Sequence, residues 1–123
     1  RMHELSVCQA LVRQLRDIAR EQHAVRITRV IVQIGPLSGV EPELLRHAYP
    51  IASAGSPAAD ATLVLEPLPI RVHCENCGAD SDASANRLLC GVCGDYRTRL
   101  ISGDELLLAS VELEAEVPSA AMH

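Results

Sequence analysis

The sequence predicts an α+β fold in which two helices pack on a small, mostly antiparallel three-stranded sheet. A module built around four cysteines is inserted before the last strand. Three observations predict this arrangement: two segments carry apolar residues at helical spacing, three segments resemble strands, and four of the five cysteines lie in one short stretch. A chain of 123 residues suffices for one domain and a small additional module.

The first helix is predicted over residues 5–19, where apolar side chains recur every three or four positions and polar ones occupy the other face. Cys8 belongs to the apolar stripe and is interpreted as a small buried hydrophobe rather than a metal ligand. Residues 26–34 are rich in Ile, Val and Thr, which predicts a strand. Gly35 and Pro36 end that strand.

A second helix is predicted over residues 42–52, because its first residue is a proline, which is favoured at that position. Pro50 is expected to kink or end this helix, since it removes one backbone hydrogen bond. Residues 62–66 predict another strand, which continues irregularly past Pro67 and Pro69. Two prolines require an edge position or bulges.

The last predicted strand spans residues 105–114, where Leu107, Ala109, Val111 and Leu113 alternate with mostly polar residues and are expected to face the core. Residues 1–70 and 103–116 would then form one α+β domain around an inserted module, residues 71–102. Residues 117–123 show no periodicity and are predicted to be disordered.

The four clustered cysteines form two Cys-x-x-Cys pairs, Cys74 with Cys77 and Cys90 with Cys93, separated by twelve residues. Each pair directs two thiolates at one point, so together the pairs complete a tetrahedron of sulfur. This geometry suits Zn(II), and the module is interpreted as zinc-ribbon-like. A glycine follows each pair, at a position where the backbone usually needs a positive φ.

Two disulfides and a rubredoxin-like iron site are the alternatives to zinc. Disulfides are disfavoured because the sequence shows no signal peptide and Cys8 would be left over. His73 precedes the first cysteine and is either an exposed neighbour, or a pH-sensitive substitute ligand or hydrogen-bond donor to the site. A zinc ion held by four sulfurs is closed to substrates, so this site alone does not define a function.

The composition excludes several classes of function. The net charge is −5, there is no lysine, and the arginines are scattered apart from Arg97 and Arg99. Nucleic-acid binding is therefore not expected, because it needs a clustered basic face and stacking aromatics, and the only aromatics are Tyr49 and Tyr96. No apolar run is long enough to cross a membrane, which favours a cytoplasmic protein.

The amino terminus offers a second candidate metal site. A histidine at position 3 can bind a metal together with the terminal amine and deprotonated backbone amides. Four nitrogens in a plane suit Ni(II) or Cu(II) and do not suit tetrahedral Zn(II). By itself, a histidine near a terminus is more often a solvated residue at the start of a helix than a metal ligand.

Four motifs occur in one order along the chain: Met2-His3-Glu4-Leu5, the run Ile34–Glu43, the two cysteine pairs and Gly103-Asp104-Glu105-Leu106. In this combination the chain closely resembles the HypA/HybF family of nickel metallochaperones. The resemblance covers residues 2–115 and implies a non-catalytic protein. Such a protein delivers nickel to the large subunit of nickel–iron hydrogenase, and in some relatives to urease, with a GTPase of the HypB family.

The resemblance implies that Met2, His3 and Glu4 bind nickel and that Cys74, Cys77, Cys90 and Cys93 bind zinc. His3 would supply its imidazole and its amide, and Glu4 its amide with help from its carboxylate. Met2 would supply the terminal amine if it were the first residue. Arg1 precedes Met2, which departs from the family's start. With Arg1 present, the four nitrogens around a planar nickel ion would come from the Arg1 amine, two backbone amides and the His3 imidazole.

Two other functions remain alternatives: a zinc-ribbon module that binds nucleic acid or another protein, and a thiol oxidoreductase that uses one cysteine pair. The acidic balance and scarce aromatics argue against nucleic-acid binding. Zinc would suppress the reactivity that an oxidoreductase needs.

Overall fold

The computed structural model describes residues 3–115, so Arg1, Met2 and the predicted disordered tail lie outside the described residues. The chain divides into two compact units. The first contains residues 3–32, 41–64 and 108–115 of the described chain, and the second contains residues 33–40 and 65–107.

The first unit begins with helix α1 (His3–Glu21), which extends two residues beyond the predicted helix at each end. Its apolar stripe is buried, as its spacing predicts, and consists of Cys8, Leu11, Val12, Leu15 and Ala19. Burying each Leu or Val side chain contributes about 1.5–3 kcal/mol, so this stripe holds α1 to the sheet and to α2. After α1, His23 adopts a left-handed conformation with φ of 52°, which reverses the chain into the next strand.

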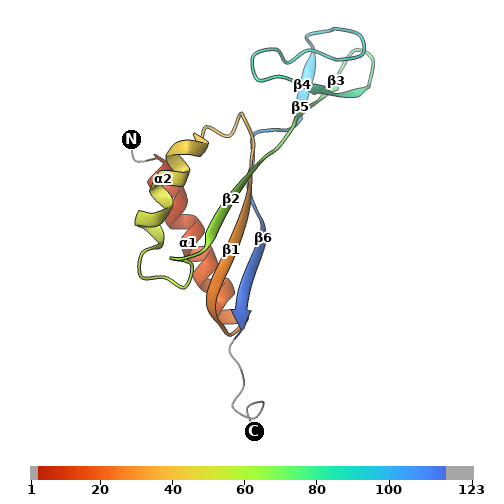
Figure 1. The fold of residues 1–123 in the computed structure, drawn as a ribbon. Helices are drawn as coiled ribbons and strands as arrows, with labels where there is room; N and C mark the ends of the chain where they lie inside the picture. Colours follow the sequence, from red (N-terminus) through yellow and green to blue (C-terminus); the bar gives the residue numbers. More distant parts are fainter. Residues whose placement is uncertain (1–2, 116–123) are drawn as a thin grey trace. The chain divides into compact units, whose positions relative to one another are not determined.

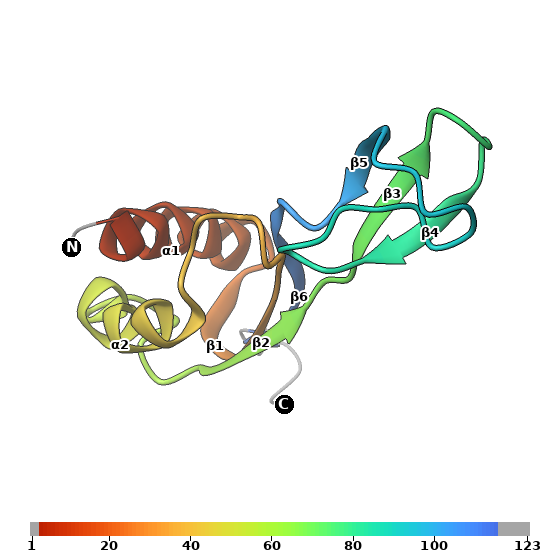
Figure 2. The same ribbon diagram turned by 90° about the horizontal axis from the view of Figure 1, so that it is seen from above.

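Helix α2 (Pro42–Ser53) packs against α1 and keeps the predicted proline at its start. Pro50 lies inside the helix and does not end it. Leu45 and Tyr49 are buried one helical turn apart, and the Tyr49 hydroxyl donates to the Ala58 carbonyl oxygen at 2.8 Å. Both helices lie on the same face of the first sheet (Figures 1 and 2).

The first sheet consists of β1 (Ala24–Ile34), β2 (Thr62–Pro67) and β6 (Leu106–Ala115), in the order β2-β1-β6. It is mixed. Between β1 and β6 the paired positions run in opposite directions, since Arg26 contacts Glu114 and Thr28 contacts Glu112.

β2 runs parallel to β1, because α2 returns the chain to the same end of the sheet (Figure 1). The three predicted strands are therefore present, with one parallel pairing. β2 is an edge strand, which is the position that the prolines at its end require.

The second unit contains a separate antiparallel sheet of β3 (Ile70–Cys74), β4 (Asp80–Ala83) and β5 (Thr98–Ser102), in the order β4-β3-β5. Strand β3 is central and buries Ile70, Val72 and Cys74 on one face. The predicted irregular continuation of the strand from residue 62 to Val72 is wrong, because β2 ends at Pro67 and a separate strand, β3, begins at Ile70.

Glycines allow a close crossing in the second unit. A Cβ atom added to Gly35 would lie 2.1 Å from the carbonyl oxygen of Gly103. Gly103 itself has φ of 119°, and a Cβ atom added to it would lie 2.8 Å from Ile70 Cγ1. No helix among the described residues is long and apolar enough to cross a membrane.

Candidate metal centre

Each cysteine pair lies in a tight loop of the second unit, and the two loops repeat the same hydrogen bonds. In the first loop Gly78 N donates to the Cys74 carbonyl oxygen at 3.0 Å, and in the second Gly94 N donates to that of Cys90 at 2.9 Å. Both glycines have φ of 78°, as the sequence predicts. Cys74 N also donates to Ala79 O at 2.9 Å, which closes its loop at the end of β3.

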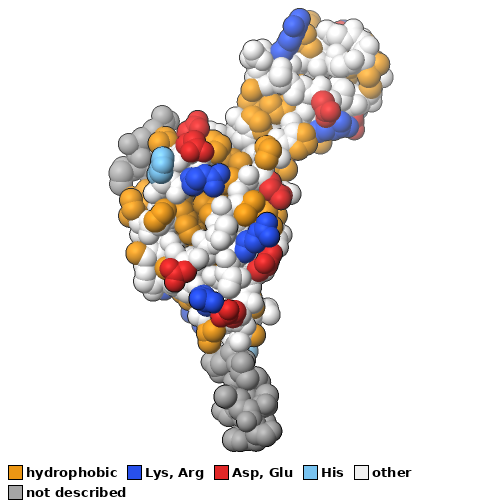
Figure 3. Space-filling model, viewed as in Figure 1, with side chains coloured by type: hydrophobic (Ala, Val, Ile, Leu, Met, Phe, Trp, Pro, Cys, Tyr) orange, Lys and Arg blue, Asp and Glu red, His pale blue; other side chains and the backbone are white. Residues whose placement is uncertain are grey.

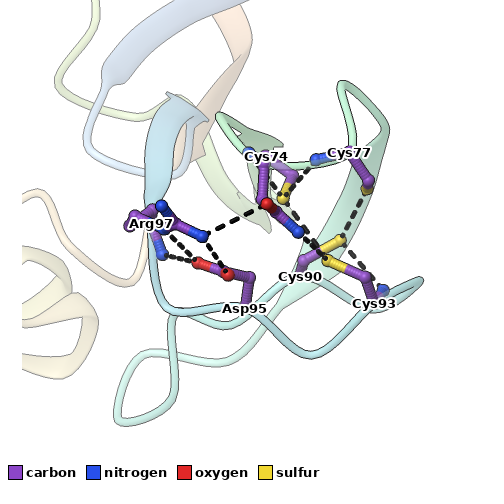
Figure 4. Close-up of polar contacts among 7 residues, drawn as sticks. Cys74, Cys77, Cys90, Cys93, Asp95 and Arg97 are labelled. Atoms are coloured by element: carbon purple, nitrogen blue, oxygen red, sulfur yellow. Dashed lines mark hydrogen bonds and ion pairs between the residues drawn. The ribbon is translucent and has the colours of Figure 1, made fainter.

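The two loops bring all four predicted sulfurs together, with their ligand atoms within 4.8 Å of one another (Figure 4). The Sγ atoms of Cys74 and Cys93 are 3.6 Å apart, and so are those of Cys77 and Cys90. Zinc–sulfur bonds of about 2.3 Å place the sulfurs of a regular tetrahedron about 3.8 Å apart. The donor set and its spacing therefore fit a structural Zn(II).

The thiols themselves favour a cation. Amides of Cys93 and Val92 donate to Cys90 Sγ and lower the pKa of that thiol to about 6. The amide of Ala79 also lowers the pKa of Cys77, but partial burial and hydrogen bonds with the neighbouring thiols outweigh it and raise this pKa to about 12. Four thiolates at such distances repel one another, and a divalent cation at their centre removes that repulsion.

His73 neighbours Cys74 in sequence but lies on the opposite face of β3, because successive strand residues alternate. Its Nδ1 lies 2.7 Å from Asp80 Oδ1, directly across from it on β4. Arg71 and Asp82 form the next pair along the same face, at 2.8 Å. His73 thus takes part in a ladder of cross-strand polar contacts between β3 and β4.

The predicted nickel residues lie at the start of α1. His3 is its first residue and is exposed, whereas Glu4 is buried and its Oε2 accepts a hydrogen bond from Glu41 N at 3.1 Å. Glu41 occupies the N-cap position of α2 and makes no capping bond with its own side chain, so the Glu4 carboxylate links the two helices through the Glu41 amide. Met2 and the Arg1 amine lie outside the described residues.

Sequence reasoning did not identify three polar residues at the cysteine cluster, Asn76, Asp95 and Arg97. Asn76 Nδ2 lies 3.7 Å from Cys93 Sγ, and Arg97 bonds both to Asn76 and to Asp95. Hydrogen bonds from Arg97 hold the pKa of Asp95 down at about 2. The sequence signal for this group was the proximity of Arg97 to the second cysteine pair.

The arginines do not gather into a basic surface on the face of the molecule that Figure 3 shows. Figure 3 shows arginines beside acidic side chains there. Strands β1 and β6 carry two such exposed pairs, Arg26 with Glu114 at 2.7 Å and Arg29 with Glu112 at 3.6 Å. Exposed pairs of this kind contribute little to stability and do not resemble a site for a polyanion.

The chain matches known proteins along almost its whole length. Residues 2–113 match the family described as "Hydrogenase/urease nickel incorporation, metallochaperone, hypA". A hydrogenase maturation factor HypA from Nitrosospira multiformis is 50% identical over 112 residues, which cover 91% of this chain and 97% of the relative. Another from Aquifex aeolicus is 41% identical over 115 residues, which cover 94% and 100% of the two chains.

The solution structure of the nickel metallochaperone HypA from Helicobacter pylori is similar to this fold, with a TM-score of 0.71 and 27% identity. The match covers 94% of this chain and all of that one. The resemblance inferred from four short motifs is therefore confirmed over the full fold. With its four-cysteine zinc site, this chain belongs to the HypA family of non-catalytic nickel metallochaperones that serve hydrogenase maturation.

Proposed function

We propose that the chain carries Ni(II) on its amino-terminal segment and delivers it to the large subunit of nickel–iron hydrogenase, while Zn(II) in the second unit has a structural role. The observation that carries this proposal is the position of His3 as the exposed first residue of α1. Amides in the first turn of a helix have no carbonyl partner within the helix. They can lose their protons to a metal without cost to the helix.

The ligands in this proposal are nitrogens: the His3 imidazole, the backbone amides of the first residues and the terminal amine. The Glu4 carboxylate is not among them, because it is buried and accepts from Glu41. The nitrogens form small fused chelate rings and impose a plane, which Ni(II) accepts and Zn(II) resists. The two metals would thereby be sorted between two sites by geometry.

Replacing His3 tests the nickel site. His3→Ala should abolish nickel binding and leave the zinc content unchanged, as measured by calorimetric titration and by the absorption band of planar Ni(II). His47→Ala is the matched control, because His47 is also exposed and lies on α2. Nickel affinity should also fall as pH drops, since protons compete for the amide nitrogens. A planar nickel band of unchanged affinity in His3→Ala would contradict the proposal.

The proposed partner for delivery is a GTPase of the HypB family, in the cytoplasm, where four thiols stay reduced. Arg13 and Arg16 are exposed on α1, the helix that begins at His3, and would face an acidic surface of the partner. Arg20 contributes less, because it contacts Asp17. Association should weaken as salt rises, because the attraction between exposed charges is screened.

Charge reversal on α1 tests this surface. Arg13→Glu combined with Arg16→Glu should lower the affinity for the GTPase about tenfold or more, mainly through a slower association rate. Arg46→Glu combined with Arg87→Glu makes the same change of charge elsewhere and should have little effect. Equal losses in the two double variants would indicate a general charge effect. Nickel binding by His3 should be intact in both, which separates docking from metal binding.

A further inference from the structure

The four sulfurs of the metal centre are not held in the same way. Cys74 Sγ accepts hydrogen bonds from the amides of Asn76 and Cys77, both at 3.3 Å. Cys90 Sγ accepts from those of Val92 and Cys93, at 3.3 and 3.4 Å. These bonds lie within each loop, so the first sulfur of each pair is fixed by backbone alone.

Cys93 is exposed, and among residues 3–115 the nitrogen donor to its sulfur is a side chain from the other loop. Asn76 Nδ2 lies 3.7 Å from Cys93 Sγ. Through this contact a side-chain amide of the first loop donates a hydrogen bond to a sulfur of the second. An amide side chain can rotate away, so the contact depends on whatever fixes Asn76.

Arg97 fixes Asn76. Its Nη2 donates to Asn76 Oδ1 at 3.2 Å, which leaves the amide nitrogen directed at the sulfur. Asp95 in turn holds the guanidinium by two bonds, from Nε at 3.0 Å and from Nη2 at 2.8 Å. Figure 4 shows this chain of contacts running from Asp95 through Arg97 to the cysteines.

We propose that Asn76 and Arg97 are positioning residues that keep Cys93 bound to the metal, and that Cys93 is the sulfur at which the zinc site opens when they are removed. A hydrogen bond donated to a metal-bound thiolate withdraws charge from the sulfur, which makes it less nucleophilic and less prone to protonation. Asp95 acts on the sulfur only through Arg97. The relay denotes these three residues, Asp95, Arg97 and Asn76, together with the hydrogen bonds that join them.

A direct electrostatic effect of Arg97 on the sulfurs is the competing account. The hydrogen bonds and the charge of Asp95 are the main reason why the pKa of Arg97 is raised, and the charges of Cys74 and Cys93 add a smaller contribution in the same direction. The two accounts differ in one respect. In the relay, Arg97 has no further effect once Asn76 is gone, whereas a direct charge effect persists without Asn76.

Three variants of the full chain, loaded with Zn(II), test the relay. Asn76→Asp has the same shape and keeps the oxygen that Arg97 binds, but replaces the donor by a second acceptor. Asn76→Ala removes the amide without adding charge. Arg97→Gln releases Asn76. Arg99→Gln is the matched control, because Arg99 is equally exposed and contacts Glu75 at 3.2 Å instead of the relay.

The first measurement is the rate at which zinc passes to a coloured chelator. Asn76→Asp should release zinc about tenfold faster or more, Asn76→Ala and Arg97→Gln less so, and Arg99→Gln at the original rate. In a chain that already carries Asn76→Ala, the further change Arg97→Gln should not alter the rate of zinc release. Unchanged release from Asn76→Asp, or an effect of Arg97→Gln that persists without Asn76, would overturn the relay.

Two further readouts separate the relay from a general loosening of the second unit. Limited alkylation followed by mass spectrometry should label Cys93 first in both Asn76 variants. With Co(II) in the site, the sulfur-to-metal charge-transfer band should move to lower energy, because the sulfur loses a donor. Equal labelling of all four cysteines, or first labelling of Cys77, would contradict the assignment of Cys93.

Discussion

Cys8 lies fully buried between α1 and α2, where its Sγ donates to the Leu45 carbonyl oxygen at 3.4 Å. Burial raises the pKa of this thiol from 9.0 to about 11, and the charge of Glu4 adds to the effect. The folded chain therefore favours the protonated thiol. Its contribution to stability is complete below pH 9 and is lost as pH rises from 9 to 11, because only the unfolded chain then releases the proton.

Stability at high pH should consequently depend on Cys8. The urea midpoint of the first unit, followed by its helical circular dichroism, should fall between pH 9 and pH 11 in the original chain. Cys8→Ala lowers stability at neutral pH, because a buried group is lost. The substitution should also reduce the loss of unfolding free energy between pH 9 and pH 11 by about 1–2 kcal/mol. An identical decline with and without Cys8 would assign it to other groups, such as Tyr49, whose pKa is raised to about 12.

Single residues also show where the sequence is informative and where it is not. The four cysteines could be assigned to one site because their spacing is local and their chemistry is specific. Glu4 could be predicted only as an acidic residue in the first turn of a helix. Its partner Glu41 is 37 residues away, so burial of its carboxylate depends on how α2 packs on α1.

Among the elements, α2 is the one that departs most clearly from its local propensity. Pro50 lies inside it, exposed, and cannot donate to the carbonyl oxygen of Arg46 one turn earlier. Packing of Leu45 and Tyr49 outweighs this loss and carries the helix on to Ser53. Tertiary contacts, which the sequence pattern does not weigh, therefore decide where the helix ends.

Pro50→Ala should restore the missing hydrogen bond and stabilise the first unit by about 1–3 kcal/mol, seen as a higher thermal midpoint. Pro57→Ala is the control, because Pro57 lies in the loop after α2. There the substitution should leave stability unchanged or lower it slightly, since it makes the unfolded chain more flexible. A lower midpoint for Pro50→Ala would mean that α2 is built around the proline.

Strand β6 illustrates a pattern that was only partly predictive. The alternation of apolar residues predicted one continuous inward face that includes Leu107 and Val111. Leu107 is instead 45% exposed, and the better covered positions change from Leu106 and Leu108 to Val111 and Leu113. The change of face occurs between residues 108 and 111, within the part of β6 that belongs to the first unit. Alternation identifies a strand but does not reveal such a shift of phase.

At the scale of the whole molecule, the two units depend on different sources of stability. Helices and an aliphatic core hold the first unit. In the second unit the buried hydrophobic residues are Ile34, Ile70, Val72, Cys74 and Cys90, and the two cysteines belong to the four-sulfur cluster. So small a core does not stabilise a fold by itself, so metal binding must supply much of the folding free energy of the second unit.

Loss of zinc should therefore unfold one unit and spare the other. Cys77→Ser, or treatment with a chelator, should abolish zinc binding and collapse the amide chemical-shift dispersion of residues 70–102, while the helical signal of α1 and α2 persists. Cys8→Ser is the matched control and should keep a full equivalent of zinc. Retention of tightly bound zinc by Cys77→Ser would refute the four-sulfur site.

The pairing of Arg71 with Ser102 has a further consequence. The chain enters and leaves the metal-binding hairpins at two residues that face each other on neighbouring strands. The two ends of such an insertion occupy one pair of facing positions on neighbouring antiparallel strands. The register shifts between Arg71 and Val72, so a graft of residues 71–102 into the hairpin of an unrelated host would carry this irregularity with it. The metal-binding part could thus diverge or be exchanged during evolution independently of the helices that precede it.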